Sequence, residues 1–145
     1  MTLRQVSVTR TVPARAEEIF DLLADPRKHA LIDGSGTVLK CAADAPVRLA
    51  KGARFAMDMR VGLPYKITNT VVEFEEGRLI AWRHFGGHRW RWRLRPLGED
   101  GTEVTETFDW THARAALLFR LVNVPARNKR AMQRTLDRLV EHFKR

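Results

Sequence analysis

Three side chains could carry acid–base chemistry in this chain: Glu106, His84 and Tyr65. A carboxylate among aromatic side chains has either a raised pKa or a cationic partner, and both mark a candidate site. A histidine in a wet pocket can act as acid, base or hydrogen-bond donor near neutral pH. Tyr65 shares a strand parity with Asn69, and both could offer hydrogen bonds to a cavity. Structural roles stay open: Glu106 could be satisfied at a cavity rim, and His84 could be an ordinary turn residue.

Whether these groups meet depends on the strands that carry them, and residues 88–95 are the clearest strand. Side chains alternate between the two faces of a strand. One face would carry His88, Trp90, Trp92 and Leu94, and the other would carry Arg89, Arg91, Arg93 and Arg95. Indole and imidazole nitrogens are costly to bury without partners. The aromatic face therefore indicates a partly polar cavity, in competition with a core that the tryptophans fill themselves.

The strand expected over residues 102–111 fits beside residues 88–97 in one register, which pairs Leu94 with Val104. The inner face then matches Trp92 with Glu106, Trp90 with Phe108 and His88 with Trp110. The outer face matches Arg95 with Glu103, Arg91 with Thr107 and Arg89 with Asp109. A shift by one residue would put arginine opposite tryptophan, so the pattern selects this register or one displaced by an even step. Acidic partners for Arg89 and Arg95 make the basic stripe a solvated face.

The loop before residue 88 decides what else joins the inner face. A three-residue loop over 85–87 would place His84, Trp82 and Ile80 there. A two-residue loop of Gly86 and Gly87 would place Arg83 and Phe85 there instead.

The remaining pattern is a first strand, two short helical segments, further strands and a helical end. Further strands are expected at 2–12, 37–42, 54–60, 65–74 and 79–85, and helices at 15–24, 27–32, 113–122 and 126–143. Pro125 is expected to interrupt the last helical stretch. The apolar stripe of residues 126–143 would lie across the aromatic face of the sheet. Asp33, in a glycine-rich loop, is a candidate for the pocket mouth.

Composition bounds the function classes. The 145 residues fit one domain over 1–145, no apolar run reaches a membrane span, and the N-terminus lacks the apolar segment of a secretory signal. A single cysteine makes a cytoplasmic location the default. The net charge of +9 comes from basic residues spread through the chain, without a zinc-finger or RNA-recognition pattern. Nucleic-acid binding is therefore not expected, although a basic surface for an acidic partner remains an alternative.

Several local patterns, in this order, carry a family resemblance. They are Val12-Pro-Ala14, Glu17-Glu-Ile-Phe20, Leu23-Ala-Asp-Pro26, Gly101-Thr-Glu-Val-Thr105 and the long amphipathic helix at the end. The chain resembles the START-like helix-grip superfamily, in particular its polyketide cyclase/dehydrase-type bacterial members (SRPBCC). The resemblance implies an α+β fold of order β-α-α-β6-α, with a curved seven-stranded antiparallel sheet wrapped around a long C-terminal helix. It also implies a cavity between sheet and helix for an apolar or aromatic molecule.

Members of this superfamily include lipid carriers, aromatase/cyclases and chaperone ATPase activators, so the fold alone does not settle the function. We predict binding of an apolar, lipid-like or polyketide-like ligand in this cavity. The predicted contacts are Met57, Met59, Tyr65, Trp82, His84, Trp90, Trp92, Glu106, Phe108 and Leu118 or Leu121. The alternatives are an aromatase/cyclase or dehydratase in which His84, Glu106 or Tyr65 moves protons, and a basic-surface interaction protein.

Neither a cofactor nor a metal site is predicted. His84, His88 and Glu106 have the composition of a two-histidine, one-carboxylate set, but nothing in their spacing enforces ligand geometry. The oligomeric state, monomer or homodimer, is left open.

Overall fold

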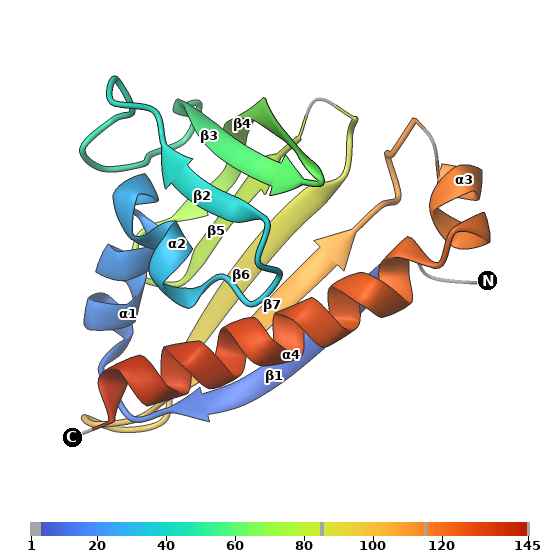
Figure 1. Ribbon diagram of the computed structural model, residues 1–145. Helices are drawn as coiled ribbons and strands as arrows, with labels where there is room; N and C mark the ends of the chain where they lie inside the picture. The colour runs from blue at the N-terminus through green and yellow to red at the C-terminus, as the bar shows by residue number, and fades with distance from the viewer. Residues whose placement is uncertain (1–3, 85, 115, 145) are drawn as a thin grey trace.

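Seven strands form one antiparallel sheet in the computed structural model, which describes residues 4–84, 86–114 and 116–144 (Figure 1). The strand order is β1-β7-β6-β5-β4-β3-β2. The elements in chain order are β1 (Gln5–Val12), α1 (Ala16–Leu23), the 3-10 turn η1 (Pro26–Lys28), α2 (His29–Ile32), β2 (Val38–Cys41), β3 (Arg54–Val61), β4 (Leu63–Glu75), β5 (Leu79–Arg83), β6 (Arg89–Pro96), β7 (Thr102–Asp109), α3 (Ala116–Leu121) and α4 (Val124–Phe143). This is the order β-α-α-β6-α expected from the sequence, and the helix expected over 113–122 is present as the short α3.

The register of β6 against β7 is the one that the alternating pattern selects. Leu94 lies opposite Val104, Trp92 opposite Glu106, and Trp90 opposite Phe108. On the other side of β6, Ile80 and Trp82 of β5 lie opposite Trp92 and Trp90. His84 N–H donates to the carbonyl oxygen of His88 at 3.0 Å, which fits a three-residue connection, although residue 85 itself lies outside the described residues. Aromatic side chains from three neighbouring strands therefore share one face.

The outer ion pairs differ in part from expectation. Arg95 pairs with Glu103 at 2.9 Å, as predicted. Arg89 lies opposite Asp109, but its ion pair is with Glu73 at 3.0 Å, while Asp109 pairs with Arg91 at 3.3 Å. The cause is a bulge in β4 between Val71 and Glu73, which turns the Glu73 carboxylate to the outer face.

The helical end of the chain breaks at Asn123, not at Pro125. Asn123 has a left-handed backbone conformation, with φ 62°, and α4 begins at the next residue. Pro125 then falls in the first turn of α4, where its missing N–H would have no intrahelical partner anyway. The result is a short α3 that is separate from the long α4.

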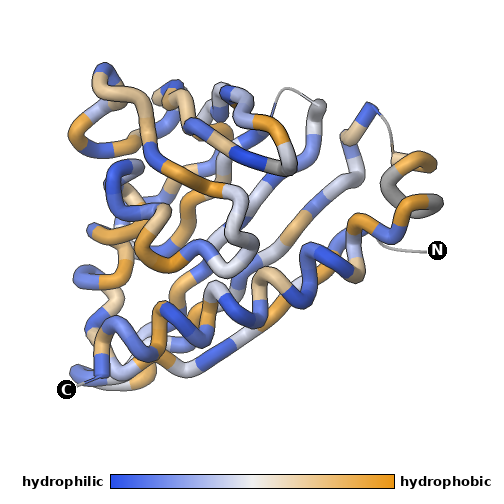
Figure 2. Tube along the Cα trace, in the orientation of Figure 1, coloured by the Kyte–Doolittle hydropathy of each residue, from blue (hydrophilic) through white to orange (hydrophobic). Residues whose placement is uncertain are grey.

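α4 runs along β1 and closes the concave side of the sheet (Figure 1). Its apolar positions recur between hydrophilic ones along the helix (Figure 2). Met132, Leu136 and Leu139 are fully buried in the core, and Val140 and Phe143 pack against it. The hydrophobic stripe predicted from the sequence is therefore the buried face of α4.

Candidate functional site

A cavity of about 780 Å³ lies between the inner face of the sheet and α4. This volume is within the range of small-molecule sites in proteins. Eight of the predicted contact residues line it: Met57, Met59, Tyr65, Trp82, His84, Trp90, Trp92 and Glu106. Asp33 and Asn69 line it as well. The cavity remains beside Trp82, Trp90 and Trp92, so these three tryptophans do not fill it.

Two of the predicted contacts, Phe108 and Leu118, do not line the cavity, and the placement of a third, Leu121, is not described. Phe108 is fully buried and packs against the rings of Trp90 and Trp110 in the core, at centroid distances of 4.9 and 5.6 Å. Leu118 lies on α3 and is 56% exposed, because the break at Asn123 separates α3 from the helix that covers the cavity. The side chain of Leu121 lies outside the described part of the structure.

Polar atoms without partners lie in the wall of the cavity. Within the described residues, the indole nitrogen Nε1 of Trp92, Oδ1 of Asn69 and Oε1 of Glu106 are buried and have no hydrogen-bond partner. Glu106 is opposite Trp92 in the sheet, so two of these atoms belong to neighbouring strands. Burial, with a smaller contribution from the charge of Asp33, raises the pKa of Glu106 well above its ordinary value. Its carboxyl group is therefore neutral over a wider pH range and can donate a hydrogen bond.

The histidines of the cavity are uncharged at neutral pH. His84 and His88 stack at a centroid distance of 4.7 Å. Burial lowers the pKa of His84, and burial together with the neighbouring His84 lowers the pKa of His88 to about 4. Both rings are therefore in the neutral form, with a lone pair on one ring nitrogen, and neither supplies a cation to the cavity near neutral pH.

His29 belongs to the cavity wall, although it was not predicted. Its ring stacks on Trp82 at 4.8 Å, and its Nε2 donates a hydrogen bond of 2.8 Å to the carbonyl oxygen of Leu23. Burial is the main cause of its lowered pKa. The available sequence signal was its i, i+3 spacing to Ile32, which places both side chains on the buried face of α2.

α4 also contributes polar residues that were not predicted. Arg127, Asn128, Arg130 and Arg134 line the cavity beside Ala131, Met132 and Thr135. Arg127, Arg130 and Arg134 recur at helical spacing next to the apolar stripe. That spacing was visible in the sequence, but a basic flank of an amphipathic helix is more commonly solvated.

The loop after α2 forms the side of the cavity mouth, and Gly34 fixes it on α4. A Cβ atom at Gly34 would lie 2.5 Å from the backbone nitrogen of Thr135. The Gly34 N–H donates to the Thr135 hydroxyl at 2.8 Å, and the guanidinium of Arg134 donates to the Gly34 carbonyl at 2.8 Å. The loop and the helix therefore meet with almost no space between their backbones, and Asp33 stands at the mouth.

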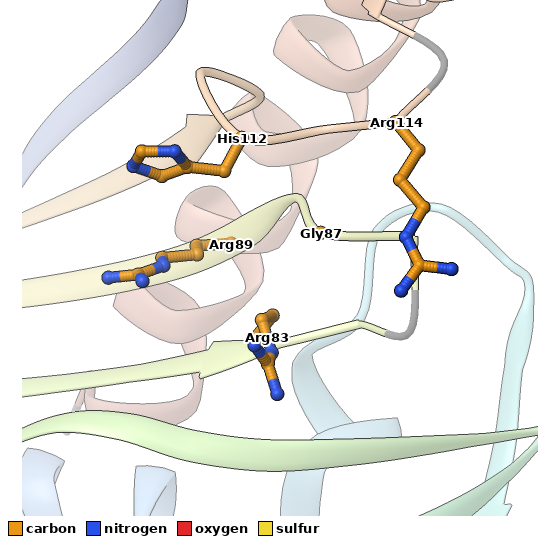
Figure 3. Close-up of a pocket in the computed structure, with 5 residues that line it drawn as sticks. All are labelled: Arg83, Gly87, Arg89, His112 and Arg114. Carbon is orange, nitrogen blue, oxygen red and sulfur yellow. The ribbon is translucent and has the colours of Figure 1, made fainter.

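A second, basic hollow lies on the outer side of the turn between β5 and β6 (Figure 3). Its volume is about 500 Å³, and Arg83, Gly87, Arg89, His112 and Arg114 line it. Gly87 has φ +96° and sits against the backbone carbonyl of His112, where a side chain would clash. This contact holds the segment after β7 on the turn and brings the basic side chains to one place.

The described residues include no group of three metal-ligating side chains at metal-binding separations. Within the same residues, no helix combines the length and apolar character needed to cross a bilayer.

A sequence-family comparison and curated relatives give two further findings. The family described as "Polyketide cyclase / dehydrase and lipid transport" matches residues 4–144. The uncharacterized protein Rv0088 of Mycobacterium tuberculosis is 37% identical over 147 aligned positions, which cover 97% of this chain. The chain spans 65% of the length of that relative.

Solved structures share the fold at low sequence identity. The AHSA1-like protein from Aeromonas hydrophila superimposes with a TM-score of 0.69 at 20% identity, over 94% of this chain and 90% of that protein. The KanY protein superimposes with a TM-score of 0.72 at 13% identity, over 99% of both chains. The Aha1 protein from Colwellia psychrerythraea, solved as a dimer, gives a TM-score of 0.65 at 14% identity, over 96% of this chain and 95% of that one. These likenesses concern the fold.

Proposed function

Because the chain belongs to the polyketide cyclase/dehydrase and lipid transport family, we propose that it binds an apolar or aromatic small molecule in the cavity between the sheet and α4. The observation that carries this proposal is the combination of aromatic walls with buried polar atoms that the chain leaves without partners. In a dry core such unpaired polar atoms would destabilise the fold, whereas a ligand in the cavity could form hydrogen bonds with them.

The walls suit a flat or flexible apolar body. Trp82, Trp90 and Trp92 offer ring faces and edges, and Met57 and Met59 offer adaptable side chains. The neutral Glu106 carboxyl and the Trp92 N–H could both donate to a carbonyl or hydroxyl oxygen of the ligand.

Native mass spectrometry of the purified protein, followed by extraction of whatever co-purifies, tests the proposal. In the variant Ala131→Phe the new ring occupies part of the cavity. The amount of co-purifying molecule should therefore fall about tenfold or more. Lys129→Phe adds the same side chain at an exposed α4 position that does not line the cavity, and it should retain wild-type amounts. The proposal fails if the wild type carries no small molecule and its tryptophan emission responds to none of a panel of apolar acids, alcohols and aromatics.

An enzymatic use of the same cavity is favoured by one observation: Glu106 is buried in its wall with Oε1 unpartnered, and burial raises its pKa well above the ordinary value. In a dehydration, Glu106 would give its proton to a leaving hydroxyl group while a base such as His84 takes the proton from the neighbouring carbon, and water leaves as the double bond forms. Tyr65 is 43% exposed, which suits a position at the mouth. Glu106→Gln keeps the shape and hydrogen-bonding capacity, so it should retain ligand but lose turnover of a hydroxy-ketone chain. Full turnover in both Glu106→Gln and His84→Ala would exclude this alternative.

The basic hollow of Figure 3 supports a third use, recognition of an acidic partner by the outer surface. It is independent of the cavity, because its side chains lie on the outer side of the sheet.

A further inference from the structure

The charged residues of the cavity are unevenly distributed. Three arginines of α4 line it, Arg127, Arg130 and Arg134, against the carboxylates of Asp33 and Glu106. Glu106 is the carboxyl group with the raised pKa, and the histidines are neutral. The mouth beside α4 is therefore positively charged, while the interior is apolar with neutral polar groups.

Asp33 does not neutralise these arginines by a direct contact. Its carboxylate accepts hydrogen bonds from the backbone N–H groups of Ser35, Gly36 and Val38, and from the Ser35 hydroxyl. Arg134 is also engaged, since its Nε donates to the Gly34 carbonyl. In the described part of the chain, Arg127 and Arg130 have no acidic side chain within ion-pair distance.

The position of Arg127 within α4 is itself unfavourable. It lies at the end of the first turn, which contains no acidic residue, and Arg130 follows it by about one turn. The N-terminal end of a helix carries a partial positive charge, so cations there are disfavoured and anions are favoured. An anion bound at these side chains would relieve both the repulsion between them and the conflict with the helix dipole.

We propose that the ligand is an amphipathic carboxylic acid whose apolar or aromatic body lies among the tryptophans and whose carboxylate is held at the mouth by Arg127 and Arg130. This inference rests on the proposed function and names the ligand class of the same cavity. Guanidinium groups match a carboxylate geometrically and form charge-assisted hydrogen bonds with it. A carbonyl or hydroxyl group on the body would be placed at Trp92, Asn69 and Glu106, where the buried partners are missing.

The test compares dansyl-undecanoic acid with its methyl ester, which differ in the charge of one end. Binding is measured by energy transfer from tryptophan to dansyl, because three tryptophans line the cavity. The acid should bind the wild type about tenfold more tightly than the ester, as expected for a charge-assisted contact. In the double variant Arg127→Gln/Arg130→Gln the acid should fall to the affinity of the ester, while ester binding stays unchanged.

The control is Lys51→Gln/Lys129→Gln, which removes two positive charges at exposed positions outside the cavity lining. It should keep the preference for the acid, so a loss there would assign the preference to net charge and overturn the inference. Equal binding of acid and ester to the wild type would overturn it as well, and would leave the proposed function standing. Binding of neither probe would count against the proposed function itself. Unchanged ester binding in the arginine variant shows that its fold is intact.

Discussion

The two faces of β6 differ in whether their polar groups have partners within the chain. On the outer face, Arg91 binds Glu73 and Asp109 at 2.8 and 3.3 Å, Arg89 binds Glu73, and Arg95 binds Glu103. On the inner face, the nitrogen of Trp92 and an oxygen of the facing Glu106 have no partner among the described residues. The outer face is thus largely completed by the chain's own charges, although Nε of Arg89 is buried there without a hydrogen-bond partner among the described residues. The inner face is incomplete in the same strand, which indicates where an outside molecule would add the most.

This contrast also predicts opposite responses to acid. The pKa of Glu73 is lowered, chiefly by its hydrogen bond to Arg91, and the pKa of Asp109 is lowered too. The pKa of Glu106 is raised by burial. Acidification should therefore reduce the stabilisation from the outer ion pairs and reduce the destabilisation from the buried Glu106 carboxylate.

The largest expected effect is on the outer face, at Glu73. Glu73→Gln leaves Arg89 without its carboxylate and removes one of the two partners of Arg91, whose side chain is only 12% exposed. We expect a loss of about 2 kcal/mol in the free energy of unfolding at neutral pH. Urea unfolding followed by tryptophan fluorescence measures it.

The pH dependence of the same variant sharpens the comparison. Because the folded pKa of Glu73 lies below the ordinary value of 4.5, its stabilisation is present above that value and is lost as the pH falls through the folded pKa. The difference between wild type and Glu73→Gln should therefore shrink on acidification. A difference that stays constant from neutral pH to below the folded pKa would contradict the ion-pair explanation.

A smaller effect of opposite sign is expected on the inner face, at Glu106. Glu106→Leu replaces a buried carboxyl group without a partner at Oε1 by an apolar side chain of similar size. It should stabilise the ligand-free protein by about 1–2 kcal/mol at neutral pH, measured by the same urea unfolding.

Ionisation can be separated from polarity by Glu106→Gln, which cannot titrate. Because the folded pKa of Glu106 is raised, its ionisation does not lower the free energy of unfolding at pH values below the unfolded pKa. As the pH rises from the unfolded to the folded pKa, the ionisation lowers the free energy of unfolding progressively. The stability of Glu106→Gln relative to wild type should therefore increase with pH. A destabilised Glu106→Leu protein would mean that the carboxyl group has a structural partner, and the contrast between the faces would disappear.

The strands and their register could be predicted because two independent patterns agree on them. The alternation in residues 88–95 fixes two faces, and the acidic and aromatic residues of 102–109 fit only one parity against them. The same reasoning placed Glu106 on the inner face, whereas Trp82 was expected there only with a three-residue loop over 85–87.

What could not be predicted depends on single backbone events that short sequence patterns do not enforce. The bulge after Val71 turns Glu73 outward, and the small Ala81 between Glu73 and Arg91 lets these two meet across β5. The left-handed Asn123 displaces Leu118 from the cavity, and asparagine permits this conformation without requiring it. That Arg127 and Arg130 line the cavity could not be predicted, because it depends on how α4 packs on the sheet.

The smallest expected effect is at the exposed end of the outer face, where Arg95 binds Glu103. The Arg95 side chain is 66% exposed, so water and salt screen the pair, and holding two long side chains costs entropy. Glu103→Gln should therefore change the urea midpoint by only a small fraction of the change in Glu73→Gln, and added salt should remove even that. The two variants carry the same chemical change and alter ion pairs of the same strand, so they compare a largely buried carboxylate that binds two arginines with an exposed pair. If Glu103→Gln were as damaging as Glu73→Gln, burial would not be what makes the outer charges stabilising, and the network around Glu73 would lose its special place in the comparison.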